Sequence, residues 1–416
     1  ANETIPPKDR GMDCVVTVPA NWGERPREET RKAARLAHLN IKQLVNEPTA
    51  AAVAYRDQLL DEGQSSKKQT IIIFDFGGGT LDVSLMEMEG LKFDVQAVAG
   101  NPRLGGRDFD RCLMNWVIQQ NKYTNLRPRD KDRIKKICCD AKCSLSKAPH
   151  CMMYFENINK KEISMKLTRS SFETICKPLF DQILDPVINV LQQKKLDKSK
   201  IDNVIMVGGS SFIPKVSQIL SGFFGKDPIR FPDPQMAVVQ GAAIIAAKYS
   251  NLETNSISIQ EVCSSTIGVR IIGGVMSSVI PQGTKIPCTK EKTFVTGTYD
   301  QSSACFDMYE GEWKMAKYNN LITAFNLSGI PPGPPGKPLY FKLSIDEDGV
   351  LEAHASCNQN GKQASITVHK NSNQYSSNDL RSKVTTNRVT KEEDEEEARV
   401  ALILANLSIY YESILT

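Results

Sequence analysis

The stretch TIIIFDFGGGTLD, residues 70–82, decides the fold more than any other part of the chain. Thr70–Phe74 is a short apolar run typical of a buried strand, and Leu81–Met88 resumes the strand pattern after the glycines. Glycines let the backbone turn with positive φ and let N–H groups approach an anion with no side chain in the way. The pattern therefore predicts a strand, a glycine turn able to hold a phosphate, and a second strand.

An ordinary hairpin is the alternative interpretation of this turn, since three glycines between two strands are common in hairpins. Two further glycine turns weaken that alternative: LGG at residues 104–106, and GGSS at residues 208–211 after an apolar strand at 201–207. Several such turns suit a cleft that wraps one nucleotide from two sides. Thr80 offers a hydroxyl to a phosphate, and Asp75 and Asp82 offer carboxylates to a magnesium shell, which prefers oxygen ligands.

The composition is that of an ordinary globular protein. The 416 residues suggest two or three domains, and 40% of them are hydrophobic and 24% charged. A net charge of +4 is too weak to favour nucleic acid or an anionic membrane as a partner. No apolar run reaches the roughly 18 residues of a membrane helix, and the first residues lack the apolar core of a secretion signal.

Eleven cysteines scattered over a long chain favour a reducing compartment over a disulfide scaffold. Cys138, Cys139 and Cys143 cluster together, with His150 and Cys151 nearby, so a metal site is one interpretation. No second Cys or His pair follows at the spacing of a zinc site. Buried or half-buried thiols are therefore the expectation here.

The residue pattern changes three times along the chain. Residues 1–250 alternate between strand and helix patterns, and residues 251–262 are rich in Asn and Ser, as in a linker. Residues 263–370 are short strands separated by Gly, Pro, Asp and Asn turns. Residues 371–416 end in an acidic run followed by VALILANLSIYY, which predicts a helix. The predicted order is α/β, linker, β and helix.

Two groups of motifs resemble the 70-kDa heat-shock chaperone family. FDFGGGTLDVS, NEPTAAAVAY, LGGRDFD and VGGSSFIPKV are similar to the motifs of its nucleotide domain. GGVMSSVIPQGTKIP, YEGE, NNLITAFNLSGIPP and IDEDGVLEAHA are similar to its peptide-binding β domain. Sugar kinases and actin share the nucleotide fold but not this β domain, so the combination is specific. The chain is identified as a divergent or N-terminally truncated member.

The resemblance implies the architecture of each segment. Residues 1–250 would be an α/β actin-like ATPase-type nucleotide-binding domain lacking its front portion, and residues 251–262 an interdomain linker. Residues 263–370 would be a β-sandwich substrate-binding domain, and residues 371–416 a partial helical lid.

The resemblance also implies roles for residues of the nucleotide site. Asp75, Asp82 and Glu47 would be the catalytic carboxylates, with Asp75 and Asp82 ordering magnesium through water. ATP hydrolysis is mostly positioning and charge neutralisation, which such groups can supply. The residues in contact with ATP or ADP would be Gly77, Gly78, Gly79 and Thr80 on the phosphates, and Lys142, Ser146, Gly208, Gly209 and Ser210 on the adenosine.

A peptide pocket follows from the same resemblance. Backbone hydrogen bonds would hold an extended chain, and one apolar pocket would select its side chain. Without the resemblance, the same positions read as core residues of a sandwich. The pocket residues would be Ile267, Val269, Ile272, Phe294, Gly297, Ala304 and Phe306, with Tyr340 making the pocket narrower than usual.

The chain departs from the family pattern at four positions around the adenosine. Cys139 stands where the family has glutamate, Cys143 and Phe212 where it has arginine, and Gln235 where it has aspartate. The family's first phosphate loop and catalytic lysine would both precede Ala1. We therefore expect weaker nucleotide binding.

The linker departs from the pattern as well. The family has a run of leucines there, whereas this chain has two large apolar residues, Ile257 and Ile259. Each buried leucine side chain is worth about 1.5–3 kcal/mol, so we expect poor coupling between the domains.

The implied function is that of an ATP-dependent chaperone of the stress response that binds unfolded or extended hydrophobic polypeptides and assists folding. J-domain co-chaperones and nucleotide-exchange factors would be its partners, without nucleic acid or membrane. It would be a monomer of the cytoplasm or nucleus. The alternatives are a peptide-binding relative that does not cycle, a fragment of an ordinary member, and an unrelated phosphotransferase.

Overall fold

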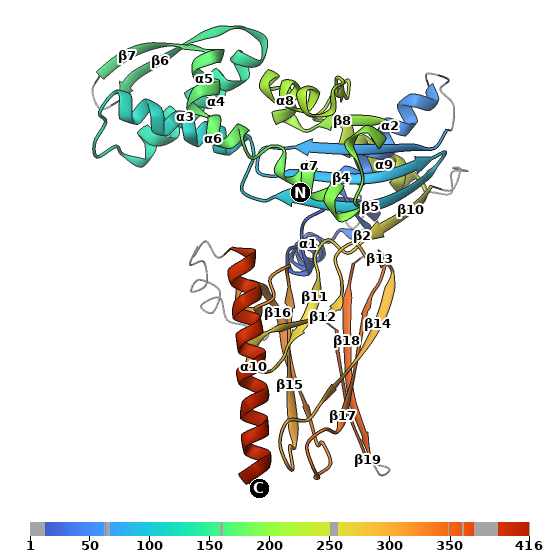
Figure 1. The fold of residues 1–416 in the computed structure, drawn as a ribbon. Helices are drawn as coiled ribbons and strands as arrows, with labels where there is room; N and C mark the ends of the chain where they lie inside the picture. Colours follow the sequence, from blue (N-terminus) through green and yellow to red (C-terminus); the bar gives the residue numbers. More distant parts are fainter. Residues whose placement is uncertain are drawn as a thin grey trace. The chain divides into compact units, whose positions relative to one another are not determined.

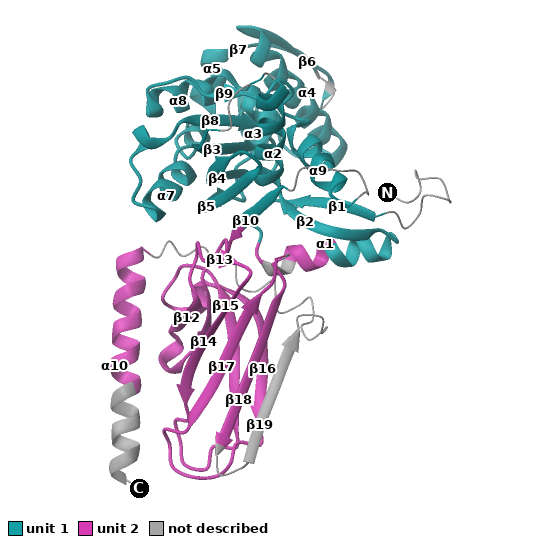
Figure 2. Cartoon of the chain, turned by 90° about the vertical axis from the view of Figure 1, so that its right-hand side faces the viewer, with its two compact units in different colours: residues 1–22, 31–260 teal, residues 23–30, 261–416 magenta. Residues whose placement is uncertain are grey.

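The computed structural model describes residues 13–61, 63, 67–158, 161–249, 257–347, 349–359, 362–369 and 390–415. The chain forms two compact units (Figure 2). Unit 1 comprises residues 1–22 and 31–260, and unit 2 comprises residues 23–30 and 261–416. Residues 251–256 of the predicted linker and 371–389 of the predicted lid lie outside the described residues.

Unit 1 is built on a mixed sheet whose strands lie in the order β10, β5, β4, β3, β8 and β9 (Figure 1). Neighbours β3, β4 and β5 are antiparallel, whereas β8 is parallel to β3 and β9 to β8. The strand bounds are Gln69–Phe76 for β3, Leu81–Glu89 for β4, Lys92–Asn101 for β5, Asn203–Val207 for β8, Ile229–Arg230 for β9 and Ser258–Val262 for β10.

The central strand β3 is buried on both faces, which explains its continuous apolar run. Alternate side chains of a strand point to opposite faces. Ile72, Phe74 and Phe76 belong to one large core with residues of α3, α4 and α7. Ile71 and Ile73 are equally buried on the other face, where α2 packs on β3. Asp75 is an even number of residues from Ile71 and Ile73, so its side chain points to the same face of the sheet as theirs.

Helices cover this sheet and extend beyond it (Figure 1). Helices α2 and α9 pack closely, because Gly241 of α9 leaves room for the carbonyl oxygen of Ala50 in α2. The helices are α2 Glu47–Asp61, α3 Gly106–Gln120, α4 Pro128–Lys147, α5 Arg169–Ile175, α6 Lys177–Phe180, α7 Asp185–Gln193, η2 Lys198–Lys200, η3 Gly209–Phe212, α8 Pro214–Phe224 and α9 Ala237–Ala247. Helix α1 (Glu24–Leu36) is divided between the units, with its residues up to Thr30 in unit 2 and the rest in unit 1.

Two smaller strand pairs complete unit 1. Strand β1 (Asp13–Val18) pairs in parallel with β2 (Asn40–Asn46). Strands β6 (His150–Ile158) and β7 (Lys161–Thr168) form an antiparallel hairpin.

Unit 2 contains two four-stranded antiparallel sheets, in the orders β12-β11-β15-β16 and β14-β17-β18-β19. The strands of these sheets are β11 Ile267–Arg270, β12 Met276–Ile280, β14 Cys288–Val295, β15 Ser303–Glu310, β16 Asn320–Ser328, β17 Pro338–Ile345, β18 Leu351–Gln359 and β19 Lys362–His369. The short strand β13 Lys285–Ile286 pairs antiparallel with the end of β10 instead. Short 3-10 turns are η4 Ile272–Gly274 and η5 Ala316–Tyr318.

The two sheets of unit 2 share one apolar core. Phe306 of β15 stacks on Phe325 of β16 at 5.5 Å and on Phe341 of β17 at 5.2 Å between ring centroids. Because Phe341 belongs to the other sheet, these rings join the two layers. Phe294 of β14 meets Phe306 and Phe341 edge-on.

Helix α10 (Lys391–Leu415) docks on unit 2 through buried and charged contacts near its start. The carboxylate of Asp394, 2% exposed, accepts hydrogen bonds from the backbone N–H groups of Lys314 and Met315. Glu397 accepts from Lys317 and from the hydroxyl of Tyr318. An apolar cluster of Val275, Met315 and Ala398 lies beside these contacts.

Candidate functional site

The glycine turn joins β3 to β4 as the sequence predicts. Asp75 lies opposite Asp82 in the ladder, so the two carboxylates flank the turn. The N–H of Gly77 donates to the carbonyl of Thr80 at 3.0 Å and closes the turn. Gly78 is exposed, while Gly77, Gly79 and Thr80 are half-buried.

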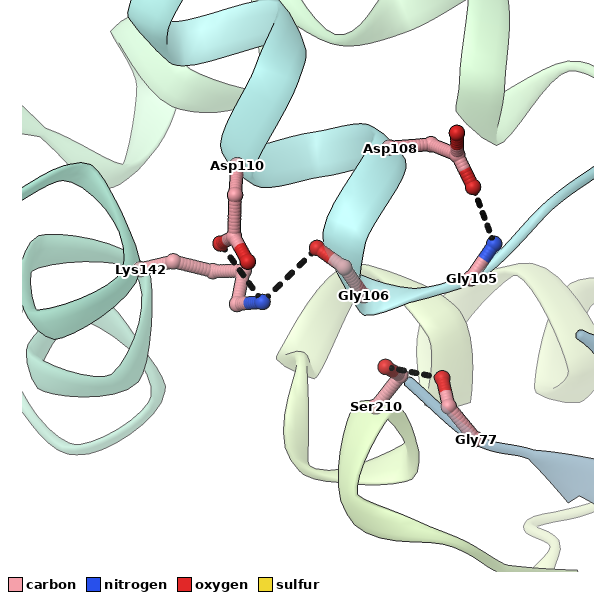
Figure 3. Close-up of polar contacts among 7 residues, drawn as sticks. All are labelled: Gly77, Gly105, Gly106, Asp108, Asp110, Lys142 and Ser210. Carbon is pink, nitrogen blue, oxygen red and sulfur yellow. Dashed lines mark hydrogen bonds and ion pairs between the residues drawn. The ribbon is translucent and has the colours of Figure 1, made fainter. Parts of the chain in front are cut away.

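The structure brings all three glycine segments together (Figure 3). At the start of α3, the N–H of Gly106 donates to the carbonyl of Gly77 at 3.1 Å, and the N–H of Arg107 donates to that of Gly78 at 2.9 Å. The hydroxyl of Ser210, from the third segment, also donates to the carbonyl of Gly77, at 2.7 Å.

Glycine is required where these segments touch. A Cβ on Gly105 would lie 2.5 Å from the carbonyl carbon of Gly79, too close for any side chain. Gly208 has a φ of +82°, and its Cβ would lie 2.5 Å from the carbonyl oxygen of Phe76. This backbone conformation and this close approach are both specific to glycine.

Three carboxylates lie close enough to repel one another. Burial, followed by the charges of Glu47 and Asp82, raises the pKa of Asp75 to about 8. Burial and the charge of Asp82 raise the pKa of Glu47, the first residue of α2, to about 7. Burial also raises the pKa of Asp82 to about 6, opposed by hydrogen bonds from Thr80 and Asn21. Holding all three of these carboxylates ionised is unfavourable unless a cation offsets their negative charge.

These oxygen donors fit a hard divalent cation. Magnesium keeps several of its waters and takes one or two carboxylates together with phosphate oxygens. Among the described residues, no group of three or more His, Cys, Asp or Glu side chains is arranged to hold a metal ion. The donor set of Asp75 and Asp82 suits a hydrated ion held through water.

Lys142 of α4 contacts two residues at the start of α3 (Figure 3). Its Nζ donates to the carbonyl of Gly106 at 2.8 Å and lies 2.7 Å from a carboxylate oxygen of Asp110. Both side chains are largely buried, at 11% and 7% exposure. The sequence predicts Lys142 as a nucleotide contact but does not predict this ion pair. Only the LGGRDFD motif singles out the region that holds Asp110.

Ser146 lies one turn further along α4 and is half-buried. Within the described part of the chain it has no polar contact with the other members of the site. Gly209 lies beside Gln235, whose Nε2 would be 3.0 Å from a Cβ on this glycine.

Arg230 lies beside the third glycine segment, and the sequence does not reveal this position. Its guanidinium carbon lies 5.7 Å from the ring centroid of Phe212, and it donates to the carbonyl of Ser211 at 3.3 Å. The ladder pairs Arg230 with Met206, two residues before Gly208. The guanidinium of Arg230 therefore places a positive charge beside Phe212, the position where the family has arginine.

The predicted peptide-binding residues separate into two groups. Ile267, Val269 and Phe306 are buried in the core of unit 2, and Phe294 and Ala304 pack against that core half-buried. Ile272 lies in η4 and is 54% exposed, and Gly297 is exposed as well. The structure thus brings the first five together and leaves Ile272 and Gly297 outside the core.

The thiols of α4 and its neighbourhood are free. Cys138 is buried and Cys139 and Cys151 are half-buried, as the sequence predicts, whereas Cys143 is exposed.

Comparison with known proteins identifies the class of protein. The family model described as "Hsp70 protein" matches residues 8–411. Heat shock cognate 70 kDa protein 3 of Dictyostelium discoideum is 35% identical over 413 residues, 97% of this chain and 65% of that protein. A heat shock 70 kDa protein of Penicillium citrinum is 35% identical over 397 residues, 93% of this chain and 78% of that protein.

The chain therefore belongs to the Hsp70 family, as the sequence motifs indicate. It spans somewhat less than two thirds of the length of the Dictyostelium relative and of the Neurospora crassa heat shock 70 kDa protein, at 65% and 64%. No helix within the described ranges is long and apolar enough to cross a membrane.

Proposed function

We propose that this chain is an ATP-dependent chaperone that binds unfolded or extended hydrophobic polypeptide segments and assists their folding. The observation that carries the proposal is the meeting of three glycine segments beside two buried carboxylates, Asp75 and Asp82, and the half-buried Glu47. This arrangement supplies N–H groups and carboxylates around one turn, which is what binding and hydrolysis of a nucleoside triphosphate require.

The nucleotide roles follow from the positions of the residues. Gly77, Gly78, Gly79 and Thr80 would present N–H groups and a hydroxyl to the β- and γ-phosphates. Magnesium, when bound, neutralises phosphate charge. Asp75, in its ionised form, would orient the attacking water and accept its proton, because its raised pKa makes the carboxylate a stronger base than an ordinary one. Asp75 and Asp82 would hold the hydrated ion through water, and Glu47 would line the same shell.

The adenosine would lie between α4 and the turn at Gly208, Gly209 and Ser210. Lys142 and Ser146 would approach it from α4. Phe212 would offer a ring face to the base, and Arg230 would supply the positive charge that Phe212 lacks. Lys142 would keep the start of α3 against the glycine turn.

Unit 2 would be the β-sandwich that binds peptide, with α10 as the first part of a lid. The exposed Ile272 and Gly297 would contact the peptide directly, whereas Ile267, Val269, Phe294, Ala304 and Phe306 would shape the pocket from below. J-domain co-chaperones and nucleotide-exchange factors would be partners, and the protein would act as a monomer in the cytoplasm or nucleus.

Steady-state ATP hydrolysis and peptide release test the proposal. The chain should hydrolyse ATP, and Asp75→Asn should reduce the rate by at least about a hundredfold, within the range of a lost general base. ATP should also accelerate dissociation of a fluorescent hydrophobic peptide. Equal hydrolysis in the wild type and Asp75→Asn would overturn the assigned catalytic role.

A peptide-binding relative that does not cycle is the second candidate function. Cys139, Cys143 and Gln235 favour it, because each replaces a charged residue of the family pattern at the adenosine side. Peptide binding without detectable ATP hydrolysis would favour this candidate over the first.

A further inference from the structure

Two thiols lie side by side on the exposed face of α4. Cys139 and Cys143 are four residues apart, which places their side chains one above the other on the same face of a helix. Interaction with the Cys143 thiol is among the causes that raise the pKa of Cys139, which agrees with this placement. Cys143 is exposed and Cys139 is half-buried, so the pair is open to solvent on one side.

The other adjacent thiols in the described structure are less accessible. Cys112 lies near Cys176, but Cys176 is 0% exposed in the core of unit 1. Cys138 is equally buried, and its burial raises the pKa of its thiol to about 12. Reaction with a dissolved reagent therefore favours Cys139 and Cys143.

We propose that Cys139 and Cys143 form a dithiol site for a trivalent arsenical. Thiol sulfur is a soft ligand that selects soft partners. Trivalent arsenic is pyramidal, so it holds its two sulfurs close together, as neighbouring thiols on one helix face can be. A linear two-coordinate ion such as Cu(I) would need the sulfurs on opposite sides of the metal.

The reaction needs no oxidant. An organic arsenous acid carries two As–OH groups, and each condenses with one thiol. Two S–H bonds and two As–O bonds break, two As–S bonds form, and the protons and hydroxyls leave as two water molecules. Arsenic stays trivalent throughout. Protonated thiols suffice, which agrees with the raised pKa of Cys139, caused by burial and then by Asp110 and opposed by Lys142.

Intact-mass spectrometry of the folded chain with phenylarsine oxide tests the site. Excess monothiol removes arsenic held by one sulfur, so the remaining adduct reports a dithiol. We expect one such adduct in the wild type, lost in Cys139→Ser and in Cys143→Ser. Cys112→Ser and Cys305→Ser are matched controls that should keep it. Cys143→Ser also distinguishes the proposed pair from the alternative pair of Cys138 and Cys139, because this variant keeps both of those thiols.

Persistence of the monothiol-resistant adduct in Cys143→Ser, or its loss in Cys112→Ser, would overturn the proposal. Cys143 is exposed, so its replacement should leave the circular dichroism spectrum and the melting temperature unchanged. Peptide mapping of the wild-type adduct gives an independent reading and should place arsenic on the peptide containing residues 139–143.

Discussion

Asp75 shows at the scale of one residue how a functional group can destabilise the fold that holds it. Its side chain is buried beside two other carboxylates, and its pKa of about 8 in the folded chain exceeds the ordinary value of 3.8. The unfolded state therefore ionises first as pH rises. Stability attributable to this residue is greatest below about pH 4 and falls as pH rises towards 8.

Asp75→Asn should accordingly stabilise the chain when nucleotide and magnesium are absent. Asp75 has to take up a proton when the chain folds at pH 7.5, whereas Asn does not, and one pKa unit corresponds to about 1.4 kcal/mol, so a gain of at least ~1 kcal/mol is expected at that pH. Urea unfolding in EDTA measures it. The gain should shrink towards pH 4. A variant less stable than the wild type at pH 7.5 would contradict this, because it would show that other groups already offset the cost of burying Asp75.

Arg230 carries a second prediction at this scale. Arg230→Ala should weaken binding of a fluorescent ATP analogue a few-fold, because a cation–π contact is worth about 0.5–1 kcal/mol at an exposed site. Arg129→Ala, an exposed arginine on α4, is the control and should bind as the wild type does. Unchanged affinity in Arg230→Ala would remove Arg230 from the site.

Sequence patterns identified the individual residues of the glycine turns but not their mutual contacts. A glycine in a local motif signals an unusual backbone, as Gly208 confirms with its positive φ. The hydrogen bond from Ser210 to Gly77 joins positions 133 residues apart, and no local pattern encodes that proximity. Arg230 was missed for the same reason, because its neighbour Phe212 is brought to it by the pairing of β8 with β9.

At the scale of elements, the turn between β8 and η3 depends on Gly208. Gly208→Ala should destabilise unit 1 by about 1–3 kcal/mol and abolish nucleotide binding. A Cβ at this position would lie 2.5 Å from the carbonyl oxygen of Phe76, and alanine would be strained at the φ of +82°. Gly222→Ala in α8 is the matched control, since its Cβ meets nothing within 4 Å and alanine favours a helix. Thermal unfolding and ATP-analogue titration measure both variants. Equal stability of the two would contradict the argument.

Helix α10 should loosen from unit 2 in Asp394→Ala. Loss of this carboxylate leaves two backbone N–H groups without their acceptor, and an unmet hydrogen bond costs about 1–3 kcal/mol. Hydrogen exchange of the first turns of α10 should therefore accelerate. Glu395→Ala, an exposed neighbour, is the control. Exchange that is unchanged in Asp394→Ala would mean that the apolar cluster alone holds the helix.

The same helix should respond to acid. Hydrogen bonds from Lys317 and then Tyr318 lower the pKa of Glu397 below its ordinary 4.5. Its contribution is therefore present above about pH 4.5 and lost as pH falls through the lower folded value. Exchange of α10 should accelerate below that pH in the wild type. Glu397→Gln should show a weaker pH dependence over the same range, and an identical profile would contradict this origin.

The long, strongly patterned elements were predictable, and the polar ones were not. Strands β3, β4 and β8 follow apolar runs, so the sequence predicts them correctly. Ser258–Val262 belongs to the predicted linker, yet it is strand β10. Its polar residues give no strand pattern, and its pairing with β5 depends on residues more than 150 positions earlier.

The proposed coupling between nucleotide and peptide would be a property of the whole molecule. Residues 258–260 of β10 pair with β5 in unit 1, and the chain passes to unit 2 at residue 261. The segment carries two large apolar residues, Ile257 and Ile259, both half-buried. The segment therefore offers little apolar surface whose burial could differ between nucleotide states. Coupling energies between sites are typically about 1–3 kcal/mol, and we expect this chain at the low end.

ATP should therefore accelerate peptide dissociation by about fivefold, which corresponds to ~1 kcal/mol of coupling. The double substitution Ile257→Ser and Ile259→Ser should abolish this acceleration while ATP hydrolysis continues, because it removes the apolar side chains of the connecting segment and leaves the glycine turns intact. Stopped-flow release of a fluorescent peptide, with and without ATP, measures both. A fivefold acceleration that survives in the double variant would mean that the coupling runs through other residues.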